Sequence, residues 1–171
     1  THKLSEDTIN PLTQINEQAV SYDSLIKSGD EAYKQQKYNE AIDFYTKAVV
    51  FIPQDKVTML KIANIYKLLG NNAKALSFYD KVLTIDSNNV DAYFNKGLVL
   101  ASQKNYDESI QCFETVIKLS PDYPYAYYSL GLAYEQKEDS EKALEYYYLY
   151  SGLEKDEKML NVVNQKIKQL E

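Results

Sequence analysis

Residues 90–123, VDAYFNKGLVLASQKNYDESIQCFETVIKLSPDY, decide the fold, because they read as two amphipathic helices joined by a short polar turn and closed by a proline. The same pattern recurs in the preceding segment of equal length, residues 56–89, and in the following one, residues 124–157. One more step back reaches residues 22–55. Four copies of one helical hairpin therefore account for residues 22–157, and we expect an all-α chain.

The four segments share the columns of side chains that a helical hairpin needs for packing. Each first helix carries a column of small residues between larger ones, namely Gly29, Ala63, Gly97 and Gly131. Each second helix has a small column and, one helical turn later, a large one: Ala41, Ala75, Ser109 and Ala143, then Tyr45, Tyr79, Phe113 and Tyr147. These positions recur on one helix face, so we expect the two helices of each hairpin to approach closely.

This periodic pattern, with Pro53 and Pro121 after two of the second helices, resembles the tetratricopeptide repeat. The resemblance implies a right-handed superhelix, an α-α solenoid, of four hairpins at residues 22–55, 56–89, 90–123 and 124–157. Departures from the family pattern are Ser28, Ala32, Lys96 and Ser109. We expect them to loosen the packing locally, in the first repeat above all.

The N-terminal extension, residues 1–21, does not match the repeat. Its first residues are polar and are expected to be disordered. A helix is predicted from near Pro11, because Leu12, Ile15 and Ala19 follow helical spacing. Whether this helix runs into the first repeat or pauses at Ser21 stays open from the sequence.

Residues 158–171 are predicted to form a C-terminal capping helix. Met159, either Val162 or Val163, Ile167 and Leu170 fall on one helical stripe. Such a stripe would cover the apolar edge that the last repeat leaves without a neighbour, as solenoids require.

Composition excludes several classes of function. The net charge of −6 and pI near 4.9 argue against a nucleic-acid or acidic-membrane binder, which usually carries a basic stripe. No apolar run approaches the roughly 20 residues of a membrane span. We expect a cytoplasmic protein, although the chain begins with Thr1, so a removed leader or anchor stays open.

Side chains suited to catalysis do not converge in this sequence. The only histidine is His2, outside the repeats, and Cys112 is the only cysteine. The repeats therefore lack the histidine that acid–base catalysis by histidine, a Ser–His pair or a His-rich metal site would need. The acidic run Glu135, Glu138, Asp139, Glu141 and Glu145 is interpreted as a solvated surface. We therefore expect no enzyme, no cofactor and no metal site.

A ligand-binding groove is predicted on the side of the first helices that faces away from the hairpin core. The residues on that side follow from the rotation of an α-helix, about 100° per residue. The candidate residues are Ile26, Tyr33, Leu60, Asn64, Lys67, Phe94, Asn95, Leu98, Tyr125, Tyr128 and Leu132. Most are apolar and form a strip that widens toward the C-terminal half, the kind of surface that usually marks a binding site. The alternative is that these apolar groups pack against the first helix of the adjacent repeat and against the N-terminal segment.

The polar candidates suggest how a ligand would be held. The amides of Asn64 and Asn95 would fix a peptide backbone, and Lys67 with Lys27 and Lys61 would give the N-terminal half a positive edge. Tetratricopeptide proteins that hold the C-terminal carboxylate of chaperones use a clamp of lysines, two asparagines and an arginine. Asn64 and Asn95 match its asparagines, but Leu60, Tyr125 and Ser129 stand at the basic places, so this clamp is not predicted.

The resemblance and the groove together predict a non-catalytic protein–protein interaction module. It would bind a peptide or protein segment in the concave groove and act as an adaptor or assembly scaffold. The alternative is a self-assembling homo-oligomer in which a terminal segment fills a neighbour's groove.

Overall fold

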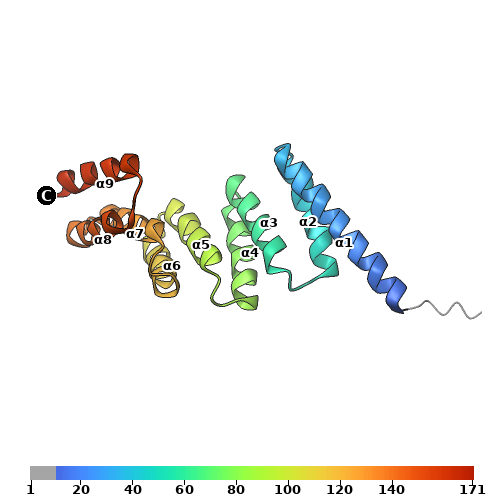
Figure 1. Ribbon diagram of the computed structural model, residues 1–171. Coiled ribbons are helices and arrows are strands. Elements are labelled where there is room, and N and C mark those ends of the chain that lie inside the picture. The colour runs from blue at the N-terminus through green and yellow to red at the C-terminus, as the bar shows by residue number, and fades with distance from the viewer. Residues whose placement is uncertain (1–10) are drawn as a thin grey trace, which may run out of the picture.

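The computed structural model describes the backbone of residues 11–171 and the side chains of residues 22–171. Within this range the chain is helical, without strands: α1 Pro11–Lys34, α2 Tyr38–Phe51, α3 Lys56–Leu68, α4 Asn72–Ile85, α5 Val90–Ser102, α6 Tyr106–Leu119, α7 Pro124–Gln136, α8 Ser140–Leu153 and α9 Glu157–Leu170. The first eight helices form four hairpins stacked in a row, followed by α9 (Figure 1). The predicted all-α solenoid is confirmed, while the disorder predicted at the start of the chain lies outside the described residues.

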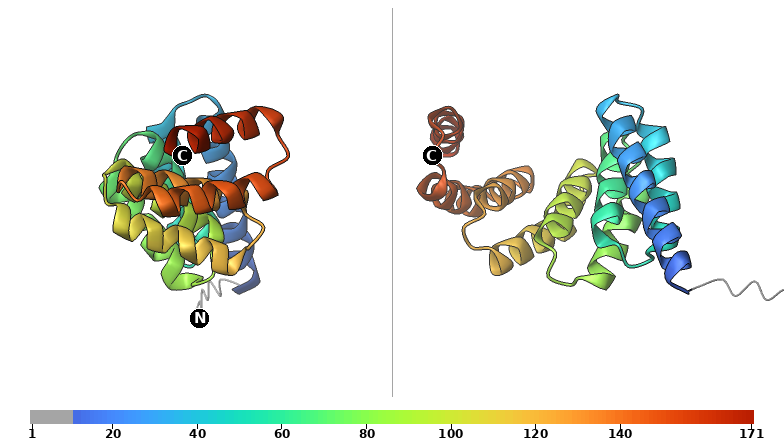
Figure 2. Two further views of the ribbon diagram at one scale, coloured as in Figure 1. Left: turned by 90° about the vertical axis from the view of Figure 1, so that its left-hand side faces the viewer. Right: turned by 45° about the vertical axis from the view of Figure 1, so that its right-hand side comes forward.

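The hairpins turn progressively along the stack. Viewed from the C-terminal end, α1 runs nearly upright whereas α8 and α9 lie nearly across it (Figure 2). Each hairpin is therefore rotated against the one before, which produces a superhelix.

Local signals explain where the helices begin. The side chains of Asp55, Asn71, Asn89, Asp139 and Asp156 accept hydrogen bonds from backbone N–H groups of the first turn of α3, α4, α5, α8 and α9. These groups have no partner inside the helix, so a capping carboxylate or amide stabilises its start. Asp139, read from the sequence as part of a solvated acidic run, is one of these caps.

The turn within each hairpin contains one residue with positive φ. This residue is Gln36, Gly70, Lys104 or Glu138, with φ between 60° and 71°. The four residues occupy the equivalent position in the four repeats, so the same left-handed turn is present in every hairpin. Only Gly70 adopts it without a steric cost from Cβ.

The small columns allow the close contact expected between the helices of a hairpin. A Cβ atom placed on Gly97 would lie 2.6 Å from Cε1 of Phe113, and one on Gly29 would lie 2.5 Å from Cε1 of Tyr45. The aromatic ring of the second helix thus lies directly on the backbone of the first.

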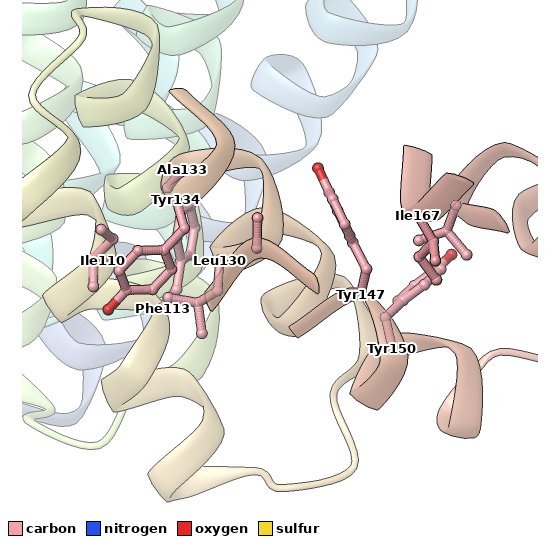
Figure 3. Close-up of a cluster of buried hydrophobic side chains, with 10 residues drawn as sticks. Ile110, Phe113, Leu130, Ala133, Tyr134, Tyr147, Tyr150 and Ile167 are labelled. Atoms are coloured by element: carbon pink, nitrogen blue, oxygen red, sulfur yellow. The ribbon is translucent and has the colours of Figure 1, made fainter. Parts of the chain in front are cut away.

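The core continues from one hairpin to the next. The cluster in Figure 3 draws on four consecutive helices, α6 to α9, and includes Ile110, Phe113, Leu130, Ala133, Tyr134, Tyr147, Tyr150 and Ile167. Neighbouring repeats therefore stabilise each other, as in other solenoids.

The helix α1 is continuous through Ser21, which settles the question left open by the sequence. The outer face of α1 carries Ser24, Ser28 and Glu31. The equivalent positions of α3 are Thr58, Ile62 and Ile65, and all three are buried. Ser28 thus lies on the end face of the described stack and does not loosen a repeat interface. Ser109, fully buried, donates a hydrogen bond of 2.9 Å to the carbonyl oxygen of Tyr106, which makes a hydroxyl acceptable there.

The last helix, α9, covers the apolar edge of the fourth hairpin. Val163 and Ile167 are buried, whereas Val162 is 43% exposed, so the structure selects Val163 for the predicted stripe. Lys166 adds an ion pair of 2.9 Å to Glu135 of α7. The capping helix predicted from the sequence is thus present.

Candidate functional site

The first helices of the hairpins form one continuous surface. Helix α3 contacts α5, and α5 contacts α7, in addition to the contacts each makes within its own hairpin. All eleven predicted groove residues lie on α1, α3, α5 and α7. A ligand crossing these helices would meet all four repeats.

A pocket of about 320 Å³ lies on the N-terminal half of this surface, between α1 and α3. It is lined by Asp30, Tyr33, Tyr45, Lys61, Asn64 and Ile65. Tyr33 remains 46% exposed. The pocket therefore combines two tyrosine side chains and an aliphatic one with polar groups, a composition suited to a peptide side chain.

Two of the residues that line the pocket, Asp30 and Lys61, form an ion pair. The Tyr45 hydroxyl donates to Asp30 over 2.5 Å, and the Lys61 ammonium lies 2.6 Å from the same carboxylate. Partial burial opposes ionisation of Asp30, but the hydrogen bonds from Lys61 and Tyr45 outweigh it and hold the pKa below its usual value. Asp30 and Lys61 are thus mutually neutralised.

The two predicted asparagines have partners within the fold. Asn64 Oδ1 accepts a hydrogen bond of 2.7 Å from the Tyr79 hydroxyl, and Asn95 Nδ2 donates to the Asp91 carbonyl oxygen over 2.8 Å. Asn95 Oδ1 also accepts from the Lys67 ammonium, at 2.5 Å. The structure therefore brings Lys67 and Asn95 together across the junction between the second and third repeats.

The predicted apolar strip is only partly open. Ile26, Leu60, Phe94, Leu98, Tyr128 and Leu132 are all half-buried and pack against core clusters. The ring centroid of Phe94 lies 5.8 Å from that of Phe113, and the ring centroid of Tyr128 lies 5.3 Å from that of Tyr150. Each ring thus packs on an aromatic residue of a second helix and is only partly exposed. Tyr125, by contrast, is 50% exposed.

Tyr123 was not expected on this surface from the sequence, and Glu135 was interpreted only as part of a solvated acidic run. Tyr123 precedes α7, and its ring centroid is 5.0 Å from that of Phe94, which extends the aromatic surface. Glu135 accepts from the Tyr147 hydroxyl at 2.5 Å and pairs with Lys166, so it is not simply solvated. The adjacent Pro124 marked Tyr123 as the residue before a helix, but nothing local indicated its contact with Phe94.

Other reactive groups are few in the part of the chain that the structure describes. Cys112 is buried, and this burial raises the pKa of its thiol to about 11, which keeps it protonated and unreactive. Residues 22–171 contain no group of three or more His, Cys, Asp or Glu side chains placed to hold a metal ion. Among the described helices, none is long and apolar enough to cross a bilayer.

Models of known protein families match most of the repeats. One, described as TPR repeat, matches residues 63–104 and 97–138, and another, described as tetratricopeptide repeat, matches residues 22–55 and 124–159. The chain belongs to the tetratricopeptide repeat family. Tetratricopeptide repeats are a protein-interaction fold, which agrees with the predicted interaction module; its non-catalytic character and the groove residues remain predictions.

Relatives share the repeats but are much longer. Tetratricopeptide repeat protein 12 of Mus musculus is 31% identical over 105 residues, which is 61% of this chain and 15% of that protein. The Hsp70-Hsp90 organizing protein of Triticum aestivum is 30% identical over 96 residues, which is 56% of this chain and 16% of that protein. This chain therefore spans about a sixth of the length of these relatives.

Solved structures show the same architecture. MamA from Desulfovibrio magneticus RS-1 superposes with a TM-score of 0.78 and 24% identity, over 88% of this chain and 89% of that one. At this identity the likeness concerns the fold alone.

Proposed function

We propose that this chain is a non-catalytic adaptor or assembly scaffold that binds a segment of another protein across its first helices. Membership of the tetratricopeptide repeat family supports an interaction module. The acidic overall charge favours a protein partner over a nucleic acid. We also propose that the protein is cytoplasmic.

The observation that carries the proposal is the exposed aromatic and aliphatic surface on the first helices. Tyr33, Val57 and Tyr125 are 46%, 61% and 50% exposed, and Tyr33 borders the pocket between α1 and α3. None of the three belongs to the buried core. Exposed tyrosines beside a pocket are typical of interaction surfaces, because the ring gives a large contact area at low entropic cost.

We propose that the groove does not recognise the free C-terminal carboxylate of its partner. The related Hsp70-Hsp90 organizing protein is named for its chaperone partners. In this chain the basic positions of the carboxylate clamp are occupied by Leu60, Tyr125 and Ser129, and Asn64 Oδ1 is already used by the Tyr79 hydroxyl. These contacts favour recognition of an internal segment.

The test compares tyrosines of equal exposure on two surfaces. The double variant Tyr33→Ala with Tyr125→Ala removes the groove tyrosines, whereas Tyr148→Ala removes a tyrosine that is 53% exposed on α8. Proteins captured from a lysate of the source cells are identified for each. We expect a partner that binds the wild type and Tyr148→Ala equally but not the double variant. Capture that survives in the double variant would contradict groove binding.

Phe94 and Tyr128 need a different control. Because both rings pack on second-helix aromatics, Phe94→Ala with Tyr128→Ala is expected to lower stability as well as binding. Thermal unfolding of this pair must therefore accompany any binding measurement.

Self-association is the second candidate. Helix α1 has 24 residues, against 13 in α3, α5 and α7, and the Tyr22 hydroxyl contacts Asp55 at 2.6 Å, so residues 11–21 extend beyond the loop that follows α2. Val50, Phe51 and Ile52 at the end of α2 are 76%, 42% and 44% exposed. Light scattering on the full chain and on a form lacking residues 1–21 tests this. A concentration-independent monomer in both would exclude self-assembly.

A further inference from the structure

Lys67, on the groove surface, differs from the other half-buried lysines in the group that its ammonium contacts. Four lysines are half-buried in the described part of the chain: Lys61, Lys67, Lys96 and Lys166. Three of them lie within 2.6–2.9 Å of a carboxylate, that of Asp30, Asp80 or Glu135 respectively. The ammonium of Lys67 instead meets the neutral amide oxygen of Asn95.

Partial burial of an ammonium without a carboxylate partner is unfavourable in free energy. Burial removes part of its hydration, and this lowers the pKa of Lys67. The amide oxygen of Asn95 returns one hydrogen bond but no charge, so two of the three N–H donors are left for another acceptor. A carboxylate arriving from outside would recover both a charge-assisted hydrogen bond and the lost solvation.

Lys67 is placed where a bound segment would pass. It lies on α3 one turn after Asn64, which lines the pocket, and its contact with Asn95 carries it to α5. Leu98, on the next turn of α5, begins the more apolar half of the surface. The ammonium is therefore at the boundary between the pocket and the aromatic half.

The repeat that contains Lys67 has a net positive charge, the sign that an acidic ligand requires. Residues 56–89 carry five lysines and two aspartates, a net charge of +3, in a chain whose net charge is −6. Lys56 pairs with Asp86 and Lys61 pairs with Asp30, so among the described residues Lys67 is the α3 lysine without a carboxylate partner. Charge complementarity thus favours an acidic group in the ligand at this point.

We infer that Lys67 receives the side-chain carboxylate of an aspartate or glutamate in the bound segment, followed by apolar residues that lie toward Leu98 and Tyr125. This rests on the proposed function, because it requires a segment in the groove. A carboxylate is favoured over a phosphate, since a single lysine without arginine supplies too few donors for a phosphate dianion.

The experiment begins with a phage-displayed library of random peptides selected on the full chain. We expect enriched sequences to share an acidic residue followed by apolar ones. An enriched peptide is then made with an amidated C-terminus, in its acidic form and with Asp→Asn or Glu→Gln, and titrated by calorimetry. Amidation removes the terminal carboxylate, so only the side chain can supply the acid.

The protein variants are Lys67→Gln, Lys67→Arg and a matched control, Lys81→Gln, which removes an exposed lysine of the same repeat. We expect Lys67→Gln to bind the acidic peptide about tenfold more weakly, the size of one charge-assisted hydrogen bond. Lys81→Gln should bind as the wild type does, and Lys67→Arg should retain most of the affinity. Against Lys67→Gln, the acidic and amide peptides should bind equally.

The outcomes separate this inference from the proposed function. Enriched peptides without an acidic residue, or an acid–amide difference that persists in Lys67→Gln, would overturn the role of Lys67 while leaving groove binding intact. No enrichment on the wild type would overturn both. Unfolding curves of Lys67→Gln should match those of the wild type, which excludes misfolding as the cause of weaker binding.

Discussion

The close approach of the two helices in each hairpin predicts that Gly97→Ala destabilises the protein. The new Cβ would lie 2.6 Å from Cε1 and 2.9 Å from Cδ1 of Phe113, well inside the usual carbon–carbon contact of about 3.5–4.0 Å. Phe113 is 1% exposed and packs on Phe94, so its ring has little room to retreat. The strain should therefore lie toward the upper end of the range for overpacked cores, about 3 kcal/mol.

The opposing effect is the gain from replacing glycine inside a helix. Alanine is favoured over glycine by roughly 1 kcal/mol at such positions. The net loss is then about 2 kcal/mol, which lowers Tm by about 4–8 °C in a chain of this size. Gly152→Ala, in α8, is the matched control: no atom lies within 4 Å of its added Cβ, so it should be neutral or slightly stabilising.

Circular dichroism, followed through thermal unfolding, measures both variants. A second test is the pair Gly97→Ala with Phe113→Leu, in which the smaller side chain should relieve part of the strain, so the two losses should not add. If Gly97→Ala unfolds at or above the wild-type temperature, the ring does not constrain the backbone as the structure implies, and the explanation of the small column is wrong.

Further predictions concern the polar contacts, a turn and the cap. Tyr147→Phe should lower the free energy of unfolding by about 1.5–3 kcal/mol, because Glu135 loses a hydrogen bond of 2.5 Å; an unchanged denaturation midpoint would refute this. Burial opposes ionisation of Glu135, but hydrogen bonds from Tyr147 and Lys166 outweigh it and lower the pKa of this carboxyl below 4.5. The stability that ionised Glu135 contributes is therefore complete above pH 4.5 and is lost as the pH falls through the lowered pKa. Glu135→Gln should reduce this loss of stability at acid pH, as measured by unfolding curves. Lys104→Gly should raise stability by about 1 kcal/mol, since it relieves a positive φ of 63°, and a lower Tm would contradict that reasoning. Removing residues 157–171 should uncover Tyr150, lower Tm and cause aggregation in light scattering, whereas an unaffected monomer would show that α9 is no cap.

The periodic sequence determined the architecture because the contacts within a hairpin are local and repeated. Gly97 and Phe113 belong to one hairpin, and the same pair recurs as Gly29 with Tyr45 and Gly131 with Tyr147. A pattern repeated in this way averages out the ambiguity of any single helix. The cap was likewise readable, because its apolar stripe has helical spacing.

The groove was less predictable, because helical periodicity says which way a side chain points but not what it meets. Phe94 and Tyr128 do point away from their own hairpin columns, yet their long side chains bend back onto Phe113 and Tyr150. Their exposure therefore depends on neighbouring repeats, and periodicity within one helix carries no information about that.

Residues 90–123, with their copies, thus determined by themselves that the chain is a stack of four hairpins and which helix faces form the core. Only the tertiary structure decided how the polar side chains pair: Asp30 with Lys61, and Lys67 with an amide rather than a carboxylate. The physical reason is that the two kinds of contact depend on different parts of the chain. Packing columns recur at the same position of every repeat and are visible along the chain, whereas the charge next to a given lysine depends on the rotation of one repeat against the next.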